Sequence, residues 1–76
     1  MVNEICFHAR DLSTIPNLSQ FNKLQILDLS CNNLTCIDNL RTLTNLRELK
    51  LYGNQIEQIE NLEWYLLIEK DEIKFI

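Results

Sequence analysis

The sequence is poor in the residues that usually turn or cross-link a small chain. It holds one Gly, one Pro and three Cys in 76 residues, and the cysteines form no CxxC pair. The odd count and scattered spacing are not typical of a disulfide framework and favour a reducing compartment. The longest apolar run, 64–68, is far short of the roughly 20 residues that a membrane span needs. The first ten residues also lack the apolar core of a secretory signal.

Basic residues are scarce as well. Seven Lys and Arg stand against eleven Asp and Glu, which gives a net charge of −4 at pH 7. This balance opposes binding to phosphate backbones and to anionic membranes. We therefore expect no nucleic-acid partner and no membrane partner. The apolar content of 46% excludes a disordered tail, and the length predicts a single domain.

The abundant residues are Leu and Asn, and they recur with a period of 22. Segments 24–45 and 46–67 align without a gap, and residues 2–23 add a third copy in the same register. The Asn at position 9 of the second and third copies is replaced by Arg10 in the first. Tandem copies of this length predict a repeat architecture, with a divergent first repeat.

Each copy contains a short segment in which apolar residues alternate with polar ones, as in a half-buried strand. Strands that recur in the same sense form a parallel sheet, and the chain between them returns on the other side. The side chains predicted to be fully buried in these strands are Leu27, Leu29, Leu49 and Leu51. The amides of Asn32 and Asn54, which follow the strands, are predicted to satisfy backbone groups of the turn and of the neighbouring repeat.

The return segments carry a second Asn, at Asn17, Asn39 and Asn61, before a short apolar run. Because Asn is a preferred helix N-cap, this pattern predicts helices of one or two turns, or 3₁₀ turns, on the outer side. The predicted fold class is α/β: a short solenoid with parallel strands on the concave side and short helices or 3₁₀ turns on the convex side.

Residues 68–76 depart from the period, and two interpretations stay open. A two-residue insertion places Ile73 and Phe75 in the core positions of a closing strand. Alternatively, the array ends at residue 67 and the rest is a divergent tail. In both cases we expect one domain, 1–76, and an uncovered C-terminal end would favour association between copies of the chain.

The repeat frame LxxLxLxxNxIxxIxNLxxLxx closely resembles the 22-residue subclass of cytoplasmic leucine-rich repeats. That subclass includes a nuclear regulatory subunit of type-1 protein phosphatase and an outer-arm dynein light chain. The resemblance implies a cytoplasmic protein-binding scaffold similar to a regulatory subunit, and nuclear or ciliary locations also occur in the subclass. It does not identify the bound protein.

No group of residues predicts catalysis. Cys6 and His8 lie on one strand face about 7 Å apart, too far for a thiolate–imidazolium pair. Glu4 shares this face, but three ligand types on one strand fall short of the four ligands that a structural zinc site uses. We expect no enzymatic activity, no cofactor and no metal site.

The outward positions of the three strands form the predicted binding surface, which we call the polar strand face. Its rows are Glu4, Ile26 and Glu48, then Cys6, Asp28 and Lys50, then His8, Ser30 and Tyr52. Solenoids bind partners on such surfaces because they are rigid and rich in exposed side chains. Tyr52 and Ile26 are the expected apolar anchors, while Asp28, Lys50 and Glu48 would orient the partner.

The predicted function is therefore that of a protein–protein interaction scaffold. A structural alternative for the central row is a plain cross-strand ion pair between Asp28 and Lys50, which would contribute well under about 1 kcal/mol. The alternative function is that of a truncated or structural repeat fragment without its own partner, prone to self-association through the open C-terminal end.

Overall fold

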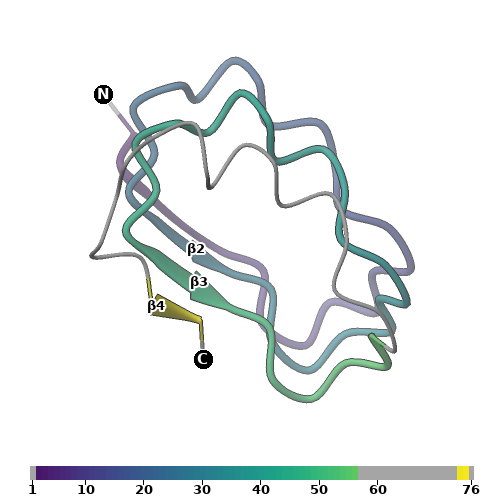
Figure 1. The fold of residues 1–76 in the computed structure, drawn as a ribbon. Coiled ribbons are helices and arrows are strands. Elements are labelled where there is room, and N and C mark those ends of the chain that lie inside the picture. Colours follow the sequence, from purple (N-terminus) through teal and green to yellow (C-terminus); the bar gives the residue numbers. More distant parts are fainter. Residues whose placement is uncertain (1, 57–73, 76) are drawn as a thin grey trace.

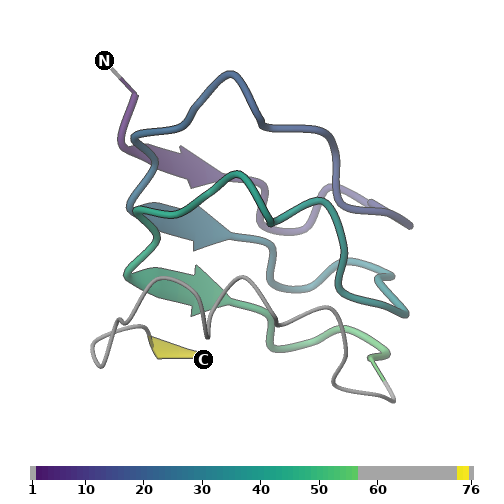
Figure 2. The same ribbon diagram turned by 45° about the horizontal axis from the view of Figure 1, so that its top comes forward.

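The structure, a computed structural model, describes residues 2–56 and 74–75. Its strands are β1 (Glu4–Cys6), β2 (Ile26–Asp28), β3 (Glu48–Lys50) and β4 (Lys74–Phe75). They form one parallel sheet in the order β1-β2-β3-β4, so each strand pairs with the next one along the chain (Figures 1 and 2). The two described return segments, between β1 and β2 and between β2 and β3, lie on the other side of the molecule and stack in the same order. The predicted cap at Asn61 and the rest of segment 57–73 lie outside the described residues.

The pairing register confirms the 22-residue period. Leu27 of β2 pairs with Ile5 of β1 and with Leu49 of β3. The pairing continues beyond the strand ends, since the Ala9 amide donates to the Ser30 carbonyl at 3.0 Å. The same bond recurs 22 residues later, from the Cys31 amide to the Tyr52 carbonyl, at 2.8 Å. Neighbouring repeats are therefore locked together along the strands and into the turns that follow.

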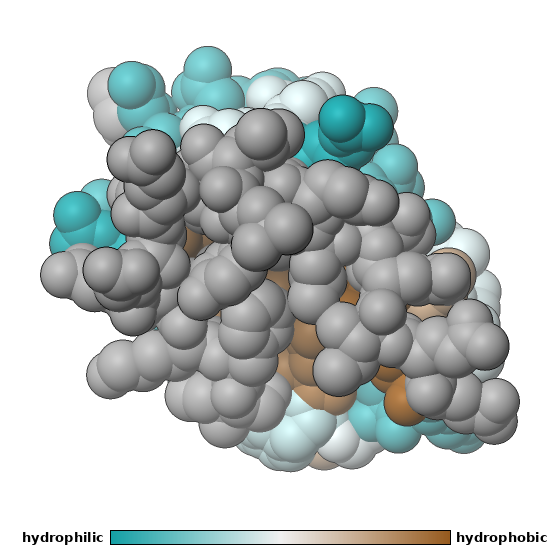
Figure 3. All heavy atoms as spheres, in the orientation of Figure 1, coloured by the Kyte–Doolittle hydropathy of each residue, from teal (hydrophilic) through white to brown (hydrophobic). Residues whose placement is uncertain are grey.

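The core is a ladder of Leu and Ile between the strands and the return segments. Its buried members are Ile15, Leu18, Leu24, Leu27, Leu29, Leu34, Ile37, Leu40, Leu43, Leu46 and Leu49. In the space-filling view, hydrophobic residues lie in the middle of the molecule and hydrophilic residues lie along its rim (Figure 3). This arrangement agrees with the alternation in the sequence, because every second strand residue belongs to the ladder.

One of the four predicted core residues is less buried than expected. Leu27, Leu29 and Leu49 are fully buried, but Leu51 is only half-buried. The described part of β4 pairs with Glu48 and Leu49, so Leu51 lies beyond the pairs that it forms. Complete burial of a core Leu in this fold requires a neighbour on both sides, which the second repeat has.

The register of β4 also differs from the expected alignment. A two-residue insertion would bring Ile73 opposite Leu49, whereas the structure pairs Phe75 with Leu49. The last strand is therefore displaced by two residues from the predicted position. A shift by two keeps the same alternation of faces, which is why the sequence pattern alone does not distinguish the two registers.

The predicted short helices are absent from the described return segments, so this half of the prediction is wrong for Asn17 and Asn39. The alternative half, 3₁₀ turns, has the i→i+3 bonding that these segments contain. Single i→i+3 hydrogen bonds replace the helices, such as the one from the Phe21 amide to the Leu18 carbonyl at 2.9 Å. The Asn17 side chain accepts from the Ser19 amide at 3.0 Å, which closes a local turn. Asn39 has φ +58°, outside the extended region that an N-cap residue adopts, so it cannot start a helix.

Asn32 joins the first and second repeats, as predicted. Its Oδ1 accepts from the amides of Arg10 and Leu12 at 2.9 and 3.0 Å. Its Nδ2 donates to the carbonyls of Phe7 and Leu29, both at 2.9 Å. The side chain is buried, so these bonds replace water for groups that have little access to it.

Asn54 repeats this arrangement one copy further on. It accepts from the Leu34 amide at 3.0 Å and donates to the Leu29 and Leu51 carbonyls, both at 2.9 Å. Each Asn thus reaches back to the repeat before it. The amide of Arg10 is satisfied by the following repeat, which explains how the first copy keeps its turn without an Asn of its own.

The turn after each strand uses a left-handed backbone. Ala9, Cys31 and Gly53 are 22 residues apart and have φ values of +56°, +57° and +74°. Only glycine adopts this conformation without strain, and other residues lose about 1–2 kcal/mol. The third repeat therefore has the residue type best suited to this position.

Gly53→Ala is expected to lower the free energy of unfolding by about 1–3 kcal/mol. The added Cβ would lie 2.9 Å from the Cys31 Sγ and 3.1 Å from the Cys31 Cα, at a φ that L-residues rarely adopt. Urea denaturation followed by circular dichroism measures the change. Ala9→Gly is the matched control, because relief of strain there is offset by the added freedom of the unfolded chain. Equal stability of Gly53→Ala and the parent would contradict the turn geometry.

Candidate functional site

The polar strand face lies on the side of the sheet opposite to the Leu ladder. The structure pairs Glu4 with Ile26 and Ile26 with Glu48, which forms the first row. The second row pairs Cys6 with Asp28 and Asp28 with Lys50. The third row consists of His8, Ser30 and Tyr52, which lie two residues after the second-row residues in the same three repeats. Neighbouring members of a row are about 4.8 Å apart, so the face brings side chains from three repeats together.

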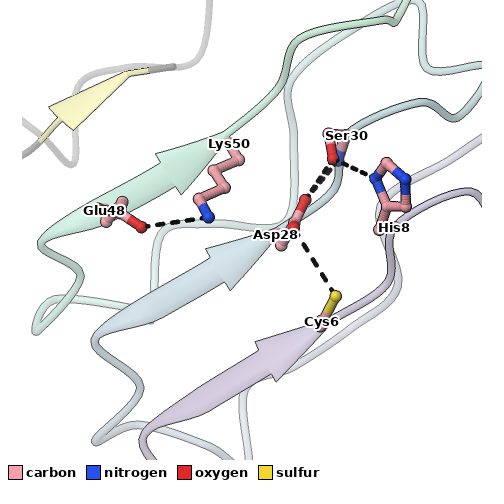
Figure 4. Close-up of polar contacts among 6 residues, drawn as sticks. All are labelled: Cys6, His8, Asp28, Ser30, Glu48 and Lys50. Atoms are coloured by element: carbon pink, nitrogen blue, oxygen red, sulfur yellow. Dashed lines mark hydrogen bonds and ion pairs between the residues drawn. The ribbon is translucent and has the colours of Figure 1, made fainter.

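Asp28 is the centre of the polar contacts on this face (Figure 4). Its Oδ1 accepts from the Ser30 amide at 2.9 Å and from the Ser30 hydroxyl at 2.5 Å. The Cys6 thiol donates to Oδ2 at 3.7 Å, a longer contact from a weak donor. The carboxylate is therefore held firmly through one oxygen and loosely through the other.

Ser30 connects Asp28 with His8. The His8 Nδ1 lies 2.7 Å from the Ser30 Oγ. Because an ionised carboxylate cannot donate, the Ser30 hydroxyl gives its one proton to Asp28 and accepts from His8. This assignment places a proton on Nδ1 of His8. Ser30 is completely buried, so it acts as a bridge within the protein and is not accessible as a nucleophile.

Burial raises the pKa of the Asp28 carboxyl, but opposing interactions outweigh this effect. The hydrogen bonds from the Ser30 hydroxyl and amide lower the pKa, followed by the Cys6 thiol and the positive charge of Lys50. The net result is a pKa below the ordinary value for Asp. Asp28 is thus ionised at neutral pH and contributes a negative charge to the middle of the polar strand face.

Lys50 forms its ion pair within its own strand. Its Nζ lies 3.7 Å from the Glu48 Oε2, and Figure 4 shows the ammonium turned toward Glu48. Among the described residues, Lys50–Glu48 is the one ion pair on the polar strand face. The alternative of a plain Asp28–Lys50 pair is therefore not what the structure shows, although Lys50 still lowers the pKa of Asp28 at longer range.

The third row, His8, Ser30 and Tyr52, has an aromatic ring at each end. The centroids of His8 and Tyr52 are 6.5 Å apart, and their planes are tilted by 47°. The two residues come from the first and third repeats and lie on either side of the buried Ser30. Tyr52 is 49% exposed, the largest exposed fraction among the described large apolar side chains. A rigid, partly exposed Tyr is typical of a contact residue in protein interfaces.

The opposite side of the molecule offers a different surface. A hollow of about 270 Å³ lies over the return segments and is lined by Asn17, Ser19, Asn39, Arg41 and Thr42. It contains a single charged residue and no large apolar side chain among these residues. We consider it weaker as a protein-binding surface than the polar strand face, because it lacks an apolar anchor.

In the described part of the chain, no group of three or more His, Cys, Asp or Glu side chains is arranged to hold a metal ion. Helices long and apolar enough to cross a bilayer are not found in the described residues either. The three cysteines are free, with Cys6 and Cys31 exposed and Cys36 half-buried.

The stacked strands, the 22-residue register and the Asn bonds define a repeat protein. Residues 22–64 match the family model of leucine-rich repeats in two copies, which is more than half of the chain. The chain therefore belongs to the leucine-rich repeat family. Comparison with curated proteins and with solved structures finds no match. Leucine-rich repeats are generally protein-interaction modules, and the family is typically non-enzymatic.

Three features of the site were missed at the level of the sequence. They are the burial of Ser30, the ring contact between His8 and Tyr52, and the Lys50–Glu48 pair. The spacing Asp-x-Ser could have indicated the hydrogen bond from Ser30 to Asp28, because a carboxylate two residues before a serine often bonds its amide, but it does not indicate that Ser30 is buried. The period placed His8 and Tyr52 in one row, but it carries no information on the side-chain orientations that bring the two rings together.

Proposed function

We propose that this protein is a cytoplasmic protein-interaction module that binds its partner on the polar strand face. In this proposal the repeats form a short solenoid of the 22-residue subclass, with the strands on its concave side. The observation that carries the proposal is the exposed Tyr52, held next to His8 on a sheet whose repeats are locked by backbone bonds. Such a surface loses little conformational freedom on binding, which favours affinity.

The chemistry of the face supports binding and not catalysis. Its serine is inaccessible, and the Asp28 carboxylate uses one oxygen to hold that serine in place. Its outward side chains combine two apolar residues, Ile26 and Tyr52, with charges of both signs. Interfaces commonly combine a few apolar or aromatic anchors with polar groups that fix orientation.

Photo-crosslinking from the face tests this function. A benzophenone amino acid introduced in place of Tyr52 is expected to crosslink a second polypeptide in cells that express the protein. The same probe in place of Thr42, which is exposed on the return side, is the matched control and should give at least fivefold less product. Excess unlabelled parent protein should compete the crosslink away, whereas excess Lys50→Glu protein should compete less well.

Three outcomes would count against the proposal. Crosslinks from position 42 and not from position 52 would move the interface to the return side. Products containing only copies of this chain would support self-association instead. An absence of products from both positions would contradict an interaction module in those cells.

A further inference from the structure

The polar strand face carries more negative than positive charge, and its one ammonium is already engaged. Glu4, Asp28 and Glu48 stand against Lys50, which is turned toward Glu48. Glu4 of β1 and Asp28 of β2 therefore have no cation in ion-pair contact among the described residues. This imbalance is local and adds to the net charge of −4 of the whole chain.

One oxygen of the Asp28 carboxylate, Oδ2, can still accept a strong hydrogen bond. A carboxylate offers about four lone-pair sites, and the Ser30 amide and hydroxyl use those of Oδ1. Oδ2 faces the exposed Cys6 thiol at 3.7 Å, which is a weak contact. A stronger donor can replace the thiol without disturbing Ser30. Oδ2 is therefore the position at which an incoming N–H group would gain a charge-assisted hydrogen bond.

Glu4 provides a second carboxylate next to the same spot. It lies two residues before Cys6 on β1, with its side chain exposed on the same face. Cys6 is paired with Asp28 of β2 and follows Glu4 by two residues on β1, so a group placed over Cys6 would have both carboxylates next to it. Two acceptors that approach from different directions fit a planar guanidinium, which has five N–H donors, better than a compact ammonium.

The apolar part of the face lies beside this position. The His8 and Tyr52 rings form the adjacent row, and Ile26 is next to Glu4 in the first row. A side chain that follows or precedes the cation in a partner would contact these residues. We infer that the polar strand face binds a protein segment that presents an arginine beside an apolar residue, with the guanidinium over Cys6 between Asp28 and Glu4. This inference rests on the proposed function.

Nuclear magnetic resonance titration of the ¹⁵N-labelled full chain tests the inference. The probes are two end-capped tripeptides, Leu-Arg-Leu and Leu-citrulline-Leu, which differ in charge and little in shape. The arginine probe is expected to shift the amide signals of Cys6, Asp28 and Ser30 and to bind at least threefold more tightly than the citrulline probe. Leu-Lys-Leu is expected to lie between the two.

Variants separate the proposed contacts from general attraction to an acidic protein. Asp28→Asn and Glu4→Gln are each expected to weaken binding of the arginine probe at least threefold. Glu4 is exposed, and its side chain makes no hydrogen bond or ion pair within the described residues, so Glu4→Gln leaves the fold intact even if Asp28→Asn perturbs Ser30. Asp11→Asn is the matched control. It removes the same charge from an exposed position at φ +56°, which Asn tolerates, and should change the affinity less than twofold.

The inference would be overturned by equal binding of the arginine and citrulline probes, or by an effect of Asp11→Asn as large as that of Glu4→Gln. Signals that shift around Arg41 instead of Asp28 would overturn it as well. If the crosslink from position 52 forms while the arginine probe causes no shift, only the arginine specificity is wrong. Failure of both experiments would remove the proposed function itself.

Discussion

Leu49→Ala is expected to lower the free energy of unfolding by about 2–5 kcal/mol. Leu49 is completely buried, and its strand position is paired with Leu27 on one side and with Phe75 on the other. Truncation therefore removes packing at the centre of the ladder and leaves a cavity that locked neighbours cannot fill. Because domains of this size have little stability to spare, we expect most of the variant to be unfolded at 37 °C.

Thermal and urea unfolding, followed by circular dichroism, measure this loss. Val2→Ala is the control, because Val2 is 44% exposed and should change the free energy of unfolding by less than about 0.5 kcal/mol. The midpoint should fall for Leu49→Ala and stay nearly constant for Val2→Ala. Two variants with equal midpoints would show that the pairing register, or the alternation of faces, is different from the one described.

The parts of the fold that repeat are the parts that the sequence predicts well. A period of 22 fixes which residues are neighbours across the sheet, so the pairs of Leu27 and Asp28 follow from arithmetic. The roles of Asn32 and Asn54 follow from the same spacing, because a buried amide after a strand must satisfy both its donors and its acceptor.

The predictions that were wrong concern residues that can support more than one local structure. Asn39 is a good N-cap by type, yet its side chain donates to the Ile15 carbonyl at 2.8 Å and its backbone is left-handed. Contact with the previous repeat therefore overrides the helix preference. The prediction of full burial near the C-terminal end of the array was wrong for a related reason. Leu51 has the same repeat position as Leu29, and its lower burial depends on the register of the last strand.

The same distinction applies to the candidate site. The rows of residues were predicted from the sequence, because they depend on the 22-residue period alone. Its electrostatics were not, because the side chain of Lys50 can reach either Asp28 or Glu48 and the structure shows the second. The consequence is functional, since this choice leaves the carboxylate of Asp28 without an ion-pair partner among the described residues. Long flexible side chains are the part of a surface that the sequence specifies least.

Asn32→Ala is expected to lower the free energy of unfolding by about 2–4 kcal/mol, although it removes no apolar packing. The truncation leaves the amides of Arg10 and Leu12 without their acceptor. It also removes the donor to the Phe7 carbonyl, while the Leu29 carbonyl keeps its bond from Asn54. Each polar group left unpaired costs about 1–3 kcal/mol when fully buried. Arg10 is exposed and Leu12 is half-buried, so water partly replaces the lost acceptor there and keeps the total for the three groups to about 2–4 kcal/mol.

Two further variants show whether the loss comes from this network. Asn45→Ala is the control, because the Asn45 side chain makes one exposed bond, to the Asn22 carbonyl at 2.7 Å, and should cost less than about 1 kcal/mol. Asn32→Asp keeps the acceptor for both amides but sets a negative charge against the carbonyls of Phe7 and Leu29. It should therefore be at least as destabilising as Asn32→Ala in urea denaturation at pH 7. If Asn32→Asp were as stable as the parent, donation to these carbonyls would not hold the first two repeats together, and the strand pairing alone would carry the junction.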